Sequence, residues 1–335
     1  GSYLLGLANP DLAWQKKYDN NLGIDVTFLD GSLNGRFDWY VSTTKGTITN
    51  VTTPPSTGFA SYTANLGEVE NKGWEAYLNW RVWNEKASMS YVTLYVSASG
   101  NENTLKKVSN SLKSMNDVTD KDYDEKSENT SVPVRYEEGA SMSTIWVVKS
   151  LGIDPETGKE VFRKKDGSLT YDWDSRDYVD GGDTRPKVSG NFGINAEWHG
   201  IGLNAGFTWR LGGQIYNTTL LNKVENADVH KNVDRRVFTD RWNTPGQVAR
   251  FKAISDDSST QPTSRFVEDY NLLTFSSLNV YYDFRECGFV KNSFLQRMKA
   301  TFYMNDIATI SSVKTERGTS YPFARTFSFS LQVTF

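Results

Sequence analysis

The sequence contains very little cysteine and histidine. Its 335 residues include one cysteine, Cys287, and two histidines, His199 and His230. A single cysteine cannot form an internal disulfide, and no Cys/His spacing matches a zinc site. Histidine is also the commonest general acid or base in enzymes, so the chain offers few candidates for histidine-based acid/base catalysis. We therefore expect neither a cofactor nor a histidine-based metal site.

The chain also lacks an excess of basic charge and a long apolar run. Its 37 lysines and arginines are outnumbered by 40 aspartates and glutamates, and the net charge is −3. The absence of a basic stripe argues against binding to nucleic acid. No run of about 20 apolar residues occurs, which excludes a transmembrane helix. A transmembrane strand needs only about 9–11 residues, half of which can be polar, so a membrane location stays open.

What the sequence does contain is alternation of apolar and polar residues, which predicts about nine antiparallel strands and an all-β fold. The clearest pair covers residues 74–82 and 92–98, with Asn84 in the short turn between them. A second pair covers residues 192–198 and 203–211. The other predicted strands are residues 14–29, 37–41, 278–284, 298–304 and 327–335.

Short and long connections alternate along the chain. The turns near Gly31, Asn84 and Gly200 are short, whereas four connections are long and show no recognisable secondary structure: residues 45–65, 101–186, 212–270 and 305–321. Soluble domains rarely repeat such loops, but outer-membrane barrels combine short turns at one end with long loops at the other. The pattern therefore favours a membrane β-barrel over a soluble sandwich.

The soluble alternative makes its own prediction. In a β-sandwich, Phe192, Ile194, Trp209 and Phe329 would form a water-free core. Such a protein would be a soluble all-β carbohydrate-binding module or a glycoside hydrolase. Glycosidases use two carboxylates, and pairs such as Glu137 with Glu138 occur. Pairs of this kind are frequent in any acidic chain, and no nucleophile elbow or phosphate-binding motif is present, so we expect a protein that is not an enzyme.

Five segments stand out along the chain, in this order: NPDLAWQK (9–16), NLGEVENKGWE (65–75), GDTRPKVSGNF (182–192), SRFVEDYNLLTFSSLNVYY (264–282) and YPFARTFSFSLQVTF (321–335). In this order they resemble the C-terminal part of the SusC/RagA-type TonB-dependent transporters of the Bacteroidota outer membrane. The residues after FVED depart from the family pattern, which leaves the register of that strand open. The ordered set is far more specific than any single segment.

The resemblance implies a large transmembrane β-barrel of about 22 strands with a plugged lumen and long extracellular loops. Residues 1–335 would be its C-terminal segment, with the plug domain and the N-terminal strands absent. The implied function is TonB-dependent import of oligomeric nutrients across the outer membrane of a Gram-negative bacterium, with glycans favoured over peptides. A siderophore or cobalamin transporter is the alternative within this class.

The resemblance also implies partners for each part of the chain. A SusD-like surface lipoprotein would act as a lid over the long loops, and TonB would act through the missing N-terminal part. Outer-membrane lipid would surround the strands. The barrel-assembly machinery would recognise the C-terminal strand, whose apolar face consists of Phe327, Phe329, Leu331, Val333 and Phe335.

The loops contain aromatic residues that could contact substrate or lid, because aromatic faces lose water easily at little entropic cost. For each one the alternative is packing of the loops against one another. The candidates are Trp146, Tyr171, Trp173, Tyr178, Tyr216 and Trp242.

Acidic residues in the same loops raise the question of a calcium site, because calcium prefers oxygen ligands. Asp172, Asp174 and Asp177 are weak candidates, since their spacing is not that of an EF-hand loop. The nearby stretch IDPETGKE (153–160) instead predicts a tight turn between two short strands.

Overall fold

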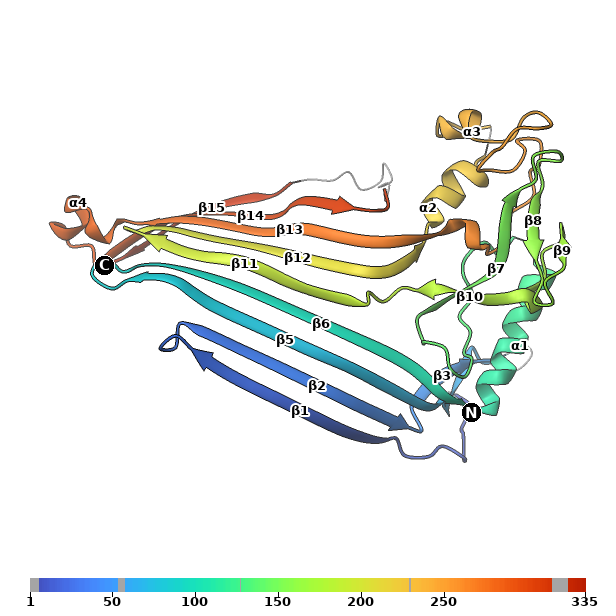
Figure 1. Ribbon diagram of the computed structural model, residues 1–335, viewed down its shortest axis with the longest axis horizontal. Helices are drawn as coiled ribbons and strands as arrows, with labels where there is room; N and C mark the ends of the chain where they lie inside the picture. The colour runs from blue at the N-terminus through green and yellow to red at the C-terminus, as the bar shows by residue number, and fades with distance from the viewer. Residues whose placement is uncertain (1–5, 54–57, 127, 229, 315–324) are drawn as a thin grey trace, which may run out of the picture.

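The computed structural model describes residues 6–53, 58–126, 128–228, 230–314 and 325–335. Its main element is a nine-stranded antiparallel sheet of long strands, seen in Figure 1 as one curved layer. The prediction of about nine strands is therefore confirmed. The strands, in their order across the sheet, are β1 (Lys16–Phe28), β2 (Leu33–Lys45), β5 (Gly67–Glu85), β6 (Ser90–Val108), β11 (Val188–Trp198), β12 (Ile201–Tyr216), β13 (Val267–Asp283), β14 (Arg297–Ser311) and β15 (Phe327–Thr334).

The register places the apolar residues of neighbouring strands in common rows. Phe192, Phe207 and Phe275 lie opposite one another on β11, β12 and β13. Their rings stack, with centroids 4.9 and 4.6 Å apart. Alternate residues share a face of a strand, so the polar residues between them lie on the other face. The register of β13, left open by the sequence, pairs Val267 with Tyr216 and includes one shift at Gly206 and Phe207 and another between Arg210 and Gly213.

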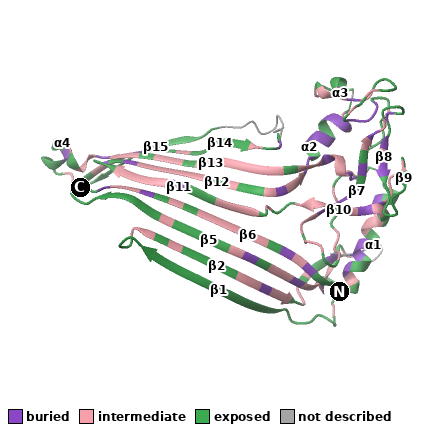
Figure 2. Ribbon diagram, in the orientation of Figure 1, coloured by how far each residue is buried: buried purple, intermediate pink, exposed green. Residues whose placement is uncertain are grey.

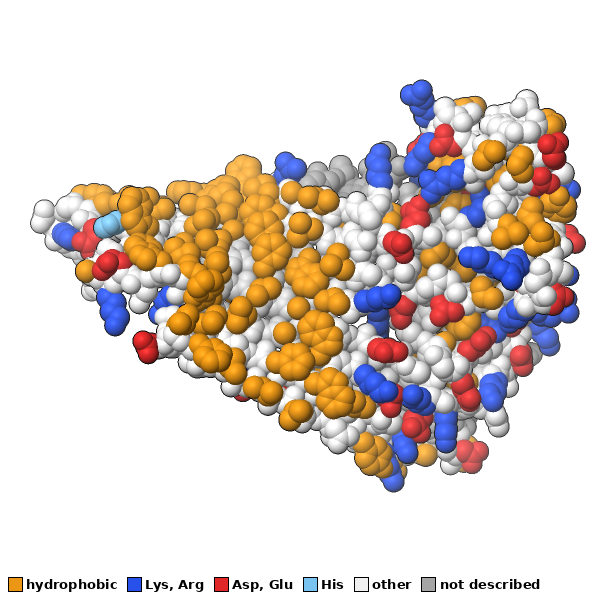
Figure 3. Space-filling model, viewed as in Figure 1, with side chains coloured by type: hydrophobic (Ala, Val, Ile, Leu, Met, Phe, Trp, Pro, Cys, Tyr) orange, Lys and Arg blue, Asp and Glu red, His pale blue; other side chains and the backbone are white. Residues whose placement is uncertain are grey.

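In the part of the chain that the structure describes, no other layer covers the apolar face of this sheet. Phe192 is 38% exposed and Phe329 is 73% exposed. Figure 3 shows a broad band of apolar side chains across the strands, with most charged side chains beyond one edge of it. The soluble-sandwich expectation of a water-free core at these residues is wrong, because the described residues form no second sheet that packs on this face and excludes water. Among the described residues, no helix has the length and apolar character needed to cross a bilayer.

The short turns all lie at one end of the sheet, and the long connections lie at the other (Figure 1). The turn from β11 to β12 needs a left-handed backbone at two residues, His199 (φ 47°) and Gly200 (φ 86°). The connection from β13 to β14 contains η5 (Phe284–Glu286) and α4 (Gly288–Lys291).

The expectation that the long connections lack secondary structure is wrong for the first three. The first contains the hairpin β3 (Ile48–Thr52) and β4 (Ser61–Asn65). The second contains α1 (Asn110–Glu125) and a four-stranded sheet, and the third contains short helical segments. The four-stranded sheet of the second connection consists of β10 (Tyr178–Asp183), β7 (Thr144–Ile153), β8 (Glu160–Arg163) and β9 (Leu169–Thr170), and η2 (Ser175–Asp177) precedes β10. The helical segments of the third connection are α2 (Thr218–Leu220), η3 (Leu221–Glu225), α3 (Arg236–Thr239) and η4 (Ser264–Phe266). Residues 315–321 of the fourth connection lie outside the described residues.

The length of β7 escaped prediction because its burial does not follow a period of two. In β7, the consecutive residues Ile145, Trp146, Val147 and Val148 are all buried. A strand buried on both faces gives a continuous apolar run rather than alternation. The strands β6 and β14 extend further than predicted, to Val108 and Ser311, and β5 and β13 begin earlier than predicted, at Gly67 and Val267. The predicted turn at residues 153–160 is confirmed, since it joins β7 to β8 and Gly158 N donates to Asp154 O at 2.8 Å.

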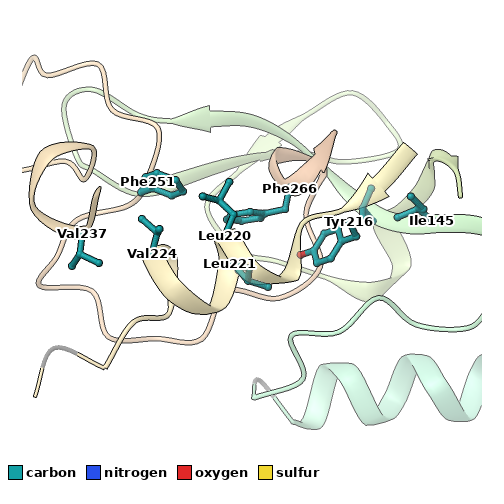
Figure 4. Close-up of a cluster of buried hydrophobic side chains, with 9 residues drawn as sticks. Ile145, Tyr216, Leu220, Leu221, Val224, Val237, Phe251 and Phe266 are labelled. Atoms are coloured by element: carbon teal, nitrogen blue, oxygen red, sulfur yellow. The ribbon is translucent and has the colours of Figure 1, made fainter. Parts of the chain in front are cut away.

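The buried residues gather at the loop end of the molecule (Figure 2). The largest cluster, drawn in Figure 4, joins two long connections that are far apart in the sequence. It consists of Ile145, Val147, Tyr216, Leu220, Leu221, Val224, Val237, Phe251 and Phe266. We call residues 110–183 together with residues 217–266 the loop body.

Candidate functional site

The polar face of the sheet is hollowed where β1, β2, β5 and β6 meet. The hollow has a volume of 880 Å³ and is lined by hydroxyl, amide and charged side chains. Asn101 Nδ2 donates to Tyr40 Oη at 2.8 Å, and Arg36 Nε donates to Asp38 Oδ2 at 2.6 Å. This surface can hold water or a polar solute, in contrast to the apolar face on the other side of the same strands.

A network of paired charges lies at the end of the sheet that carries the short turns. Tyr281 Oη donates to Glu197 Oε2 at 2.7 Å, and Arg285 forms an ion pair with the same carboxylate. Arg297 Nη2 lies 2.6 Å from Asp283 Oδ2, and Asp283 is buried. These contacts connect β11, β13 and β14. Each of these carboxylates has a cationic partner, which suits a structural role.

The loop body is held together by a buried ion network of Arg265, Glu160 and Glu225. Arg265 Nη2 lies 2.7 Å from Glu160 Oε2 and 2.5 Å from Glu225 Oε1. Thr263 Oγ1 donates to Glu160 Oε1 at 2.5 Å. Burial alone lowers the pKa of the Arg265 guanidinium, but the two carboxylates outweigh it, so the pKa is raised above its ordinary value. Arg265 therefore stays charged and joins the two halves of the loop body.

Three of the six candidate aromatics lie inside the loop body or at its base. Trp146, Tyr178 and Tyr216 are 4%, 1% and 8% exposed. Trp146 Nε1 donates to Arg135 O at 3.1 Å, and the Arg135 guanidinium lies over the Trp146 and Tyr178 rings. Burial raises the pKa of the Tyr178 hydroxyl. Their burial favours the alternative stated for them, packing of the loops.

The other three candidates keep exposed surface. Tyr171 is 50% exposed, and Trp173 and Trp242 are half-buried. Tyr171 and Trp173 line one pocket between the two halves of the loop body. Trp242 does not line this pocket; its Nε1 donates to Pro155 O at 2.7 Å, next to Asp154, which accepts from Tyr171 Oη. The structure therefore places Tyr171 and Trp173 at one pocket, and Trp173 also contacts the buried Tyr178.

The weak calcium candidates are not gathered into a site. Within the described ranges, no group of three acidic, histidine or cysteine side chains is placed to hold a metal ion. Arg176 Nη2 lies 2.5 Å from Asp174 Oδ2 and lowers the pKa of that carboxyl. Asp177 Oδ1 accepts a hydrogen bond from Lys165 N at 3.0 Å. Asp172 has a free carboxylate but, in the part of the chain described, no acidic neighbours that complete a cage.

The apolar residues of the last strand lie as the alternation predicts. Phe327, Phe329, Leu331 and Val333 lie opposite Met304, Phe302, Ala300 and Met298 of β14 on the apolar face. The Phe335 ring stacks on Phe294, with centroids 5.8 Å apart. The role of this strand in barrel assembly stays a prediction.

Sequence reasoning missed the ion network and the cation–π cluster around Arg135. Charged residues in a long loop ordinarily indicate a solvated surface. A signal was nevertheless present, because Glu160 and Arg265 each lie within segments rich in large apolar residues, EVF and SRFV. Charges embedded in such segments are candidates for buried pairs.

No protein-family model matches the sequence. TonB-dependent receptor P39 of Formosa agariphila is 23% identical over 354 aligned residues, which cover 90% of this chain and 32% of the relative. TonB-dependent receptor P3 of the same organism is 25% identical, with 100% of this chain and 36% of the relative covered. TonB-dependent receptor SusC of Bacteroides thetaiotaomicron is 38% identical over 72 residues, 21% of this chain and 7% of the relative.

This chain is similar to the SusC-like TonB-dependent receptors. The fold agrees. The RagAB peptide transporter superposes with a TM-score of 0.74 at 19% identity, covering 92% of this chain and 33% of that one. The closed-closed state of the RagAB peptide importer gives 0.75 at 20% identity, covering 93% and 34%.

TonB-dependent receptors are outer-membrane β-barrel proteins, and the nine-stranded sheet is part of the wall of such a barrel. The uncovered apolar face is then its lipid-facing side, and the polar face lines the lumen. These relatives are named receptors and transporters, not enzymes. The chain spans about a third of the length of the curated relatives P39 and P3.

Proposed function

We propose that this chain forms barrel wall and extracellular loops of a TonB-dependent importer of oligomeric nutrients. The observation that carries the proposal is the sheet with one apolar, uncovered face and one polar, hollowed face. A wall of this kind separates lipid from an aqueous lumen. In this proposal residues 1–335 are the C-terminal barrel segment, and a plug domain and further strands belong to the remainder of the receptor.

The proposal assigns partners to the two ends of the wall. A SusD-like surface lipoprotein docks on the loop body, whose buried cores make it a folded platform rather than a set of free loops. TonB acts through the N-terminal part of the receptor. The barrel-assembly machinery recognises β15, and outer-membrane lipid covers the apolar band.

A glycan is the favoured cargo in this proposal. RagAB is named a peptide transporter, so the fold alone accommodates peptides. The exposed aromatic surface of Tyr171 and Trp173 favours sugars, because flat aromatic faces match the apolar faces of sugar rings. No strongly cationic or anionic patch marks the lumenal hollow, whose lining mixes both signs with amides and hydroxyls among the described residues.

The test is made in the producing organism. The receptor is tagged and purified from outer membranes, and co-purifying proteins are identified by mass spectrometry. A deletion strain and its complemented form are then grown on oligosaccharide mixtures or on peptide mixtures as the limiting nutrient. We expect recovery with a surface lipoprotein and a growth defect on oligosaccharides. Recovery in the soluble fraction would overturn the proposal, and a defect on peptides alone would overturn the choice of glycan.

A further inference from the structure

A pocket in the loop body has the composition of a sugar site. It has a volume of 340 Å³, at the lower end of the range for small-molecule sites. Its walls come from both halves of the loop body, residues 159–173 and residues 252–261. Phe162, Tyr171 and Trp173 supply three aromatic walls around it.

The aromatic walls are fixed in place before any ligand arrives. Trp173 Nε1 donates to Pro262 O at 3.0 Å, and its ring packs edge-on against Tyr178 with centroids 5.5 Å apart. Tyr171 Oη donates to Asp154 Oδ2 at 2.6 Å, while half of the Tyr171 surface stays exposed. Rigid aromatic groups bind at a lower entropic cost than mobile ones.

Most charges that line the pocket are already paired within the protein. Lys252 Nζ lies 3.3 Å from Asp256 Oδ1 and donates to Ser258 Oγ at 3.0 Å. Glu160 pairs with Arg265, which it shares with Glu225. Among the lining residues, Lys159 and Asp172 have no ion pair within the described part of the chain, and they are of opposite sign. The unpaired charges at the pocket therefore give little preference for an anionic or a cationic ligand.

Four polar groups at the pocket have no partner within the described residues. They are the Asp172 carboxylate, the Lys159 ammonium, the Ser259 hydroxyl and the Gln261 Oε1, whose own amide nitrogen donates to Tyr123 O. A carboxylate can accept from two neighbouring hydroxyls, and the ammonium donates to others. Polar groups spaced around aromatic walls match a ring that is apolar on its faces and polar at its edge.

A peptide fits this pocket less well. Peptides are commonly bound by adding a strand to an open sheet edge. The edge strand that leads into the pocket is β9, which has only two residues, 169 and 170; the other edge of that four-stranded sheet is β10. We propose that this pocket binds one or two rings of an uncharged oligosaccharide, with Tyr171 and Trp173 as stacking walls and Asp172 as hydroxyl acceptor. The inference rests on the proposed function and names its substrate class.

The experiment uses the full-length receptor in detergent micelles and isothermal titration calorimetry. The probes are malto-, cello-, laminari- and xylohexaose, with a neutral hexapeptide and a sulfated hexasaccharide for comparison. The variants are Tyr171→Ala and Asp172→Asn. Phe238→Ala is the matched control, because Phe238 is an exposed aromatic of the same loop body outside this pocket.

We expect at least one neutral hexaose to bind, with an affinity about tenfold lower for Tyr171→Ala and reduced for Asp172→Asn. Phe238→Ala should bind like the wild type. Equal affinity in all variants would overturn the pocket as the binding site. Binding of only the peptide or the sulfated probe, or of no probe, would overturn the ligand class.

The growth assay of the deletion and complemented strains distinguishes failure of the pocket proposal from failure of the proposed function. If the complemented strain still imports oligosaccharides while the variants bind normally, the importer stands and only the pocket is wrong. If the receptor is not in the outer membrane and no nutrient depends on it, both fail. Unchanged protease-cleavage patterns of Tyr171→Ala confirm that its loop body remains folded.

Discussion

The phenol ring of Tyr281 lies directly over Gly202 of the neighbouring strand. The two residues are opposite one another in the β12–β13 register. A Cβ atom on Gly202 would overlap the Tyr281 ring. The glycine thus leaves room for the ring, and the ring covers backbone that the glycine leaves bare. The same arrangement recurs at Tyr40 with Gly73.

Replacing Gly202 by alanine should therefore destabilise the wall. The new methyl group forces Tyr281 away and weakens its hydrogen bond to Glu197, with an expected loss of about 1–3 kcal/mol. The measurement is urea unfolding of the full-length receptor, followed by tryptophan fluorescence. Gly288→Ala is the control, because the nearest atom that its new methyl group would meet is 4.0 Å away.

A double variant shows whether the loss of stability in Gly202→Ala comes from the clash with the Tyr281 ring or from the substitution of the glycine itself. In Gly202→Ala/Tyr281→Ala the ring that clashes is gone, so the loss should be smaller than the sum of the two single losses. Additive losses would mean that the ring and the glycine do not interact.

The two faces of one strand should respond differently to the same charge. Phe207 lies near the middle of β12 in the apolar phenylalanine stack, and Thr208 lies on the opposite face, where it forms a hydrogen bond with Ser276. Phe207→Lys should cost about 2–4 kcal/mol, because it places an ammonium against hydrocarbon. Thr208→Lys should be tolerated, because its ammonium reaches the aqueous lumen.

Folding into lipid vesicles, followed by unfolding in denaturant, measures both losses. The wild type and the two lysine variants are compared in the same vesicles. An equal loss in the two variants would contradict the assignment of the phenylalanine face to lipid.

The strands could be read from the sequence because the environment of the wall alternates residue by residue. Phe207 faces lipid and Thr208 faces the lumen, so the polarity of each side chain indicates the face of the sheet on which it lies. This is why the existence and order of the nine strands were predictable, although the full lengths of β5, β6, β13 and β14 were not. The unpredicted residues of these strands lie at the loop end of the sheet, where the alternation of environments stops.

The loop body could not be predicted in the same way, because its stability depends on residues far apart in the chain. Arg265 and Glu160 are separated by 105 positions, and nothing local indicates that they meet. Likewise, the composition of the loops does not distinguish Tyr178, which is buried, from Tyr171, which is half exposed. Candidate residues could be named from the sequence, but their burial required the fold.

Asp234 provides a test of loop stability against pH. Arg236 Nη2 lies 2.7 Å from Asp234 Oδ2, and its hydrogen bonds lower the pKa of the carboxyl from 3.8 to about 2. A carboxyl group whose pKa is lower in the folded state than in the unfolded state stabilises the fold. This stabilisation is complete at pH values above the unfolded-state pKa. The stabilisation is therefore present above about pH 4 and disappears as the pH falls towards 2.

Hydrogen–deuterium exchange of α3 in the wild type and in Asp234→Asn measures this effect. At pH 6 the variant should be less protected than the wild type, and near pH 2 the two should converge. Asp257→Asn is the control, because that exposed carboxylate has no ion pair among the described residues. A difference that persists unchanged at pH 2 would show that the carboxylate charge is not responsible.

Removing Arg265 should unfold the loop body while leaving the wall intact. In Arg265→Ala, Glu160 and Glu225 remain buried without their cation, which costs about 3–5 kcal/mol for a buried pair broken from one side. Arg250→Ala is the matched control, since the Arg250–Glu268 pair has the same 2.7 Å separation but an arginine side chain that is 56% exposed. An exposed pair contributes only about 0–1 kcal/mol.

Limited proteolysis of the receptor in vesicles distinguishes these outcomes. Arg265→Ala should be cleaved rapidly within residues 217–266 while the strands stay protected, and Arg250→Ala should resemble the wild type. A triple variant, Glu160→Gln/Glu225→Gln/Arg265→Met, removes the stranded charges and should regain part of the protection. If Arg265→Ala is as resistant as Arg250→Ala, the apolar core around Phe251 and Phe266 is sufficient to hold the loop body without the ion network.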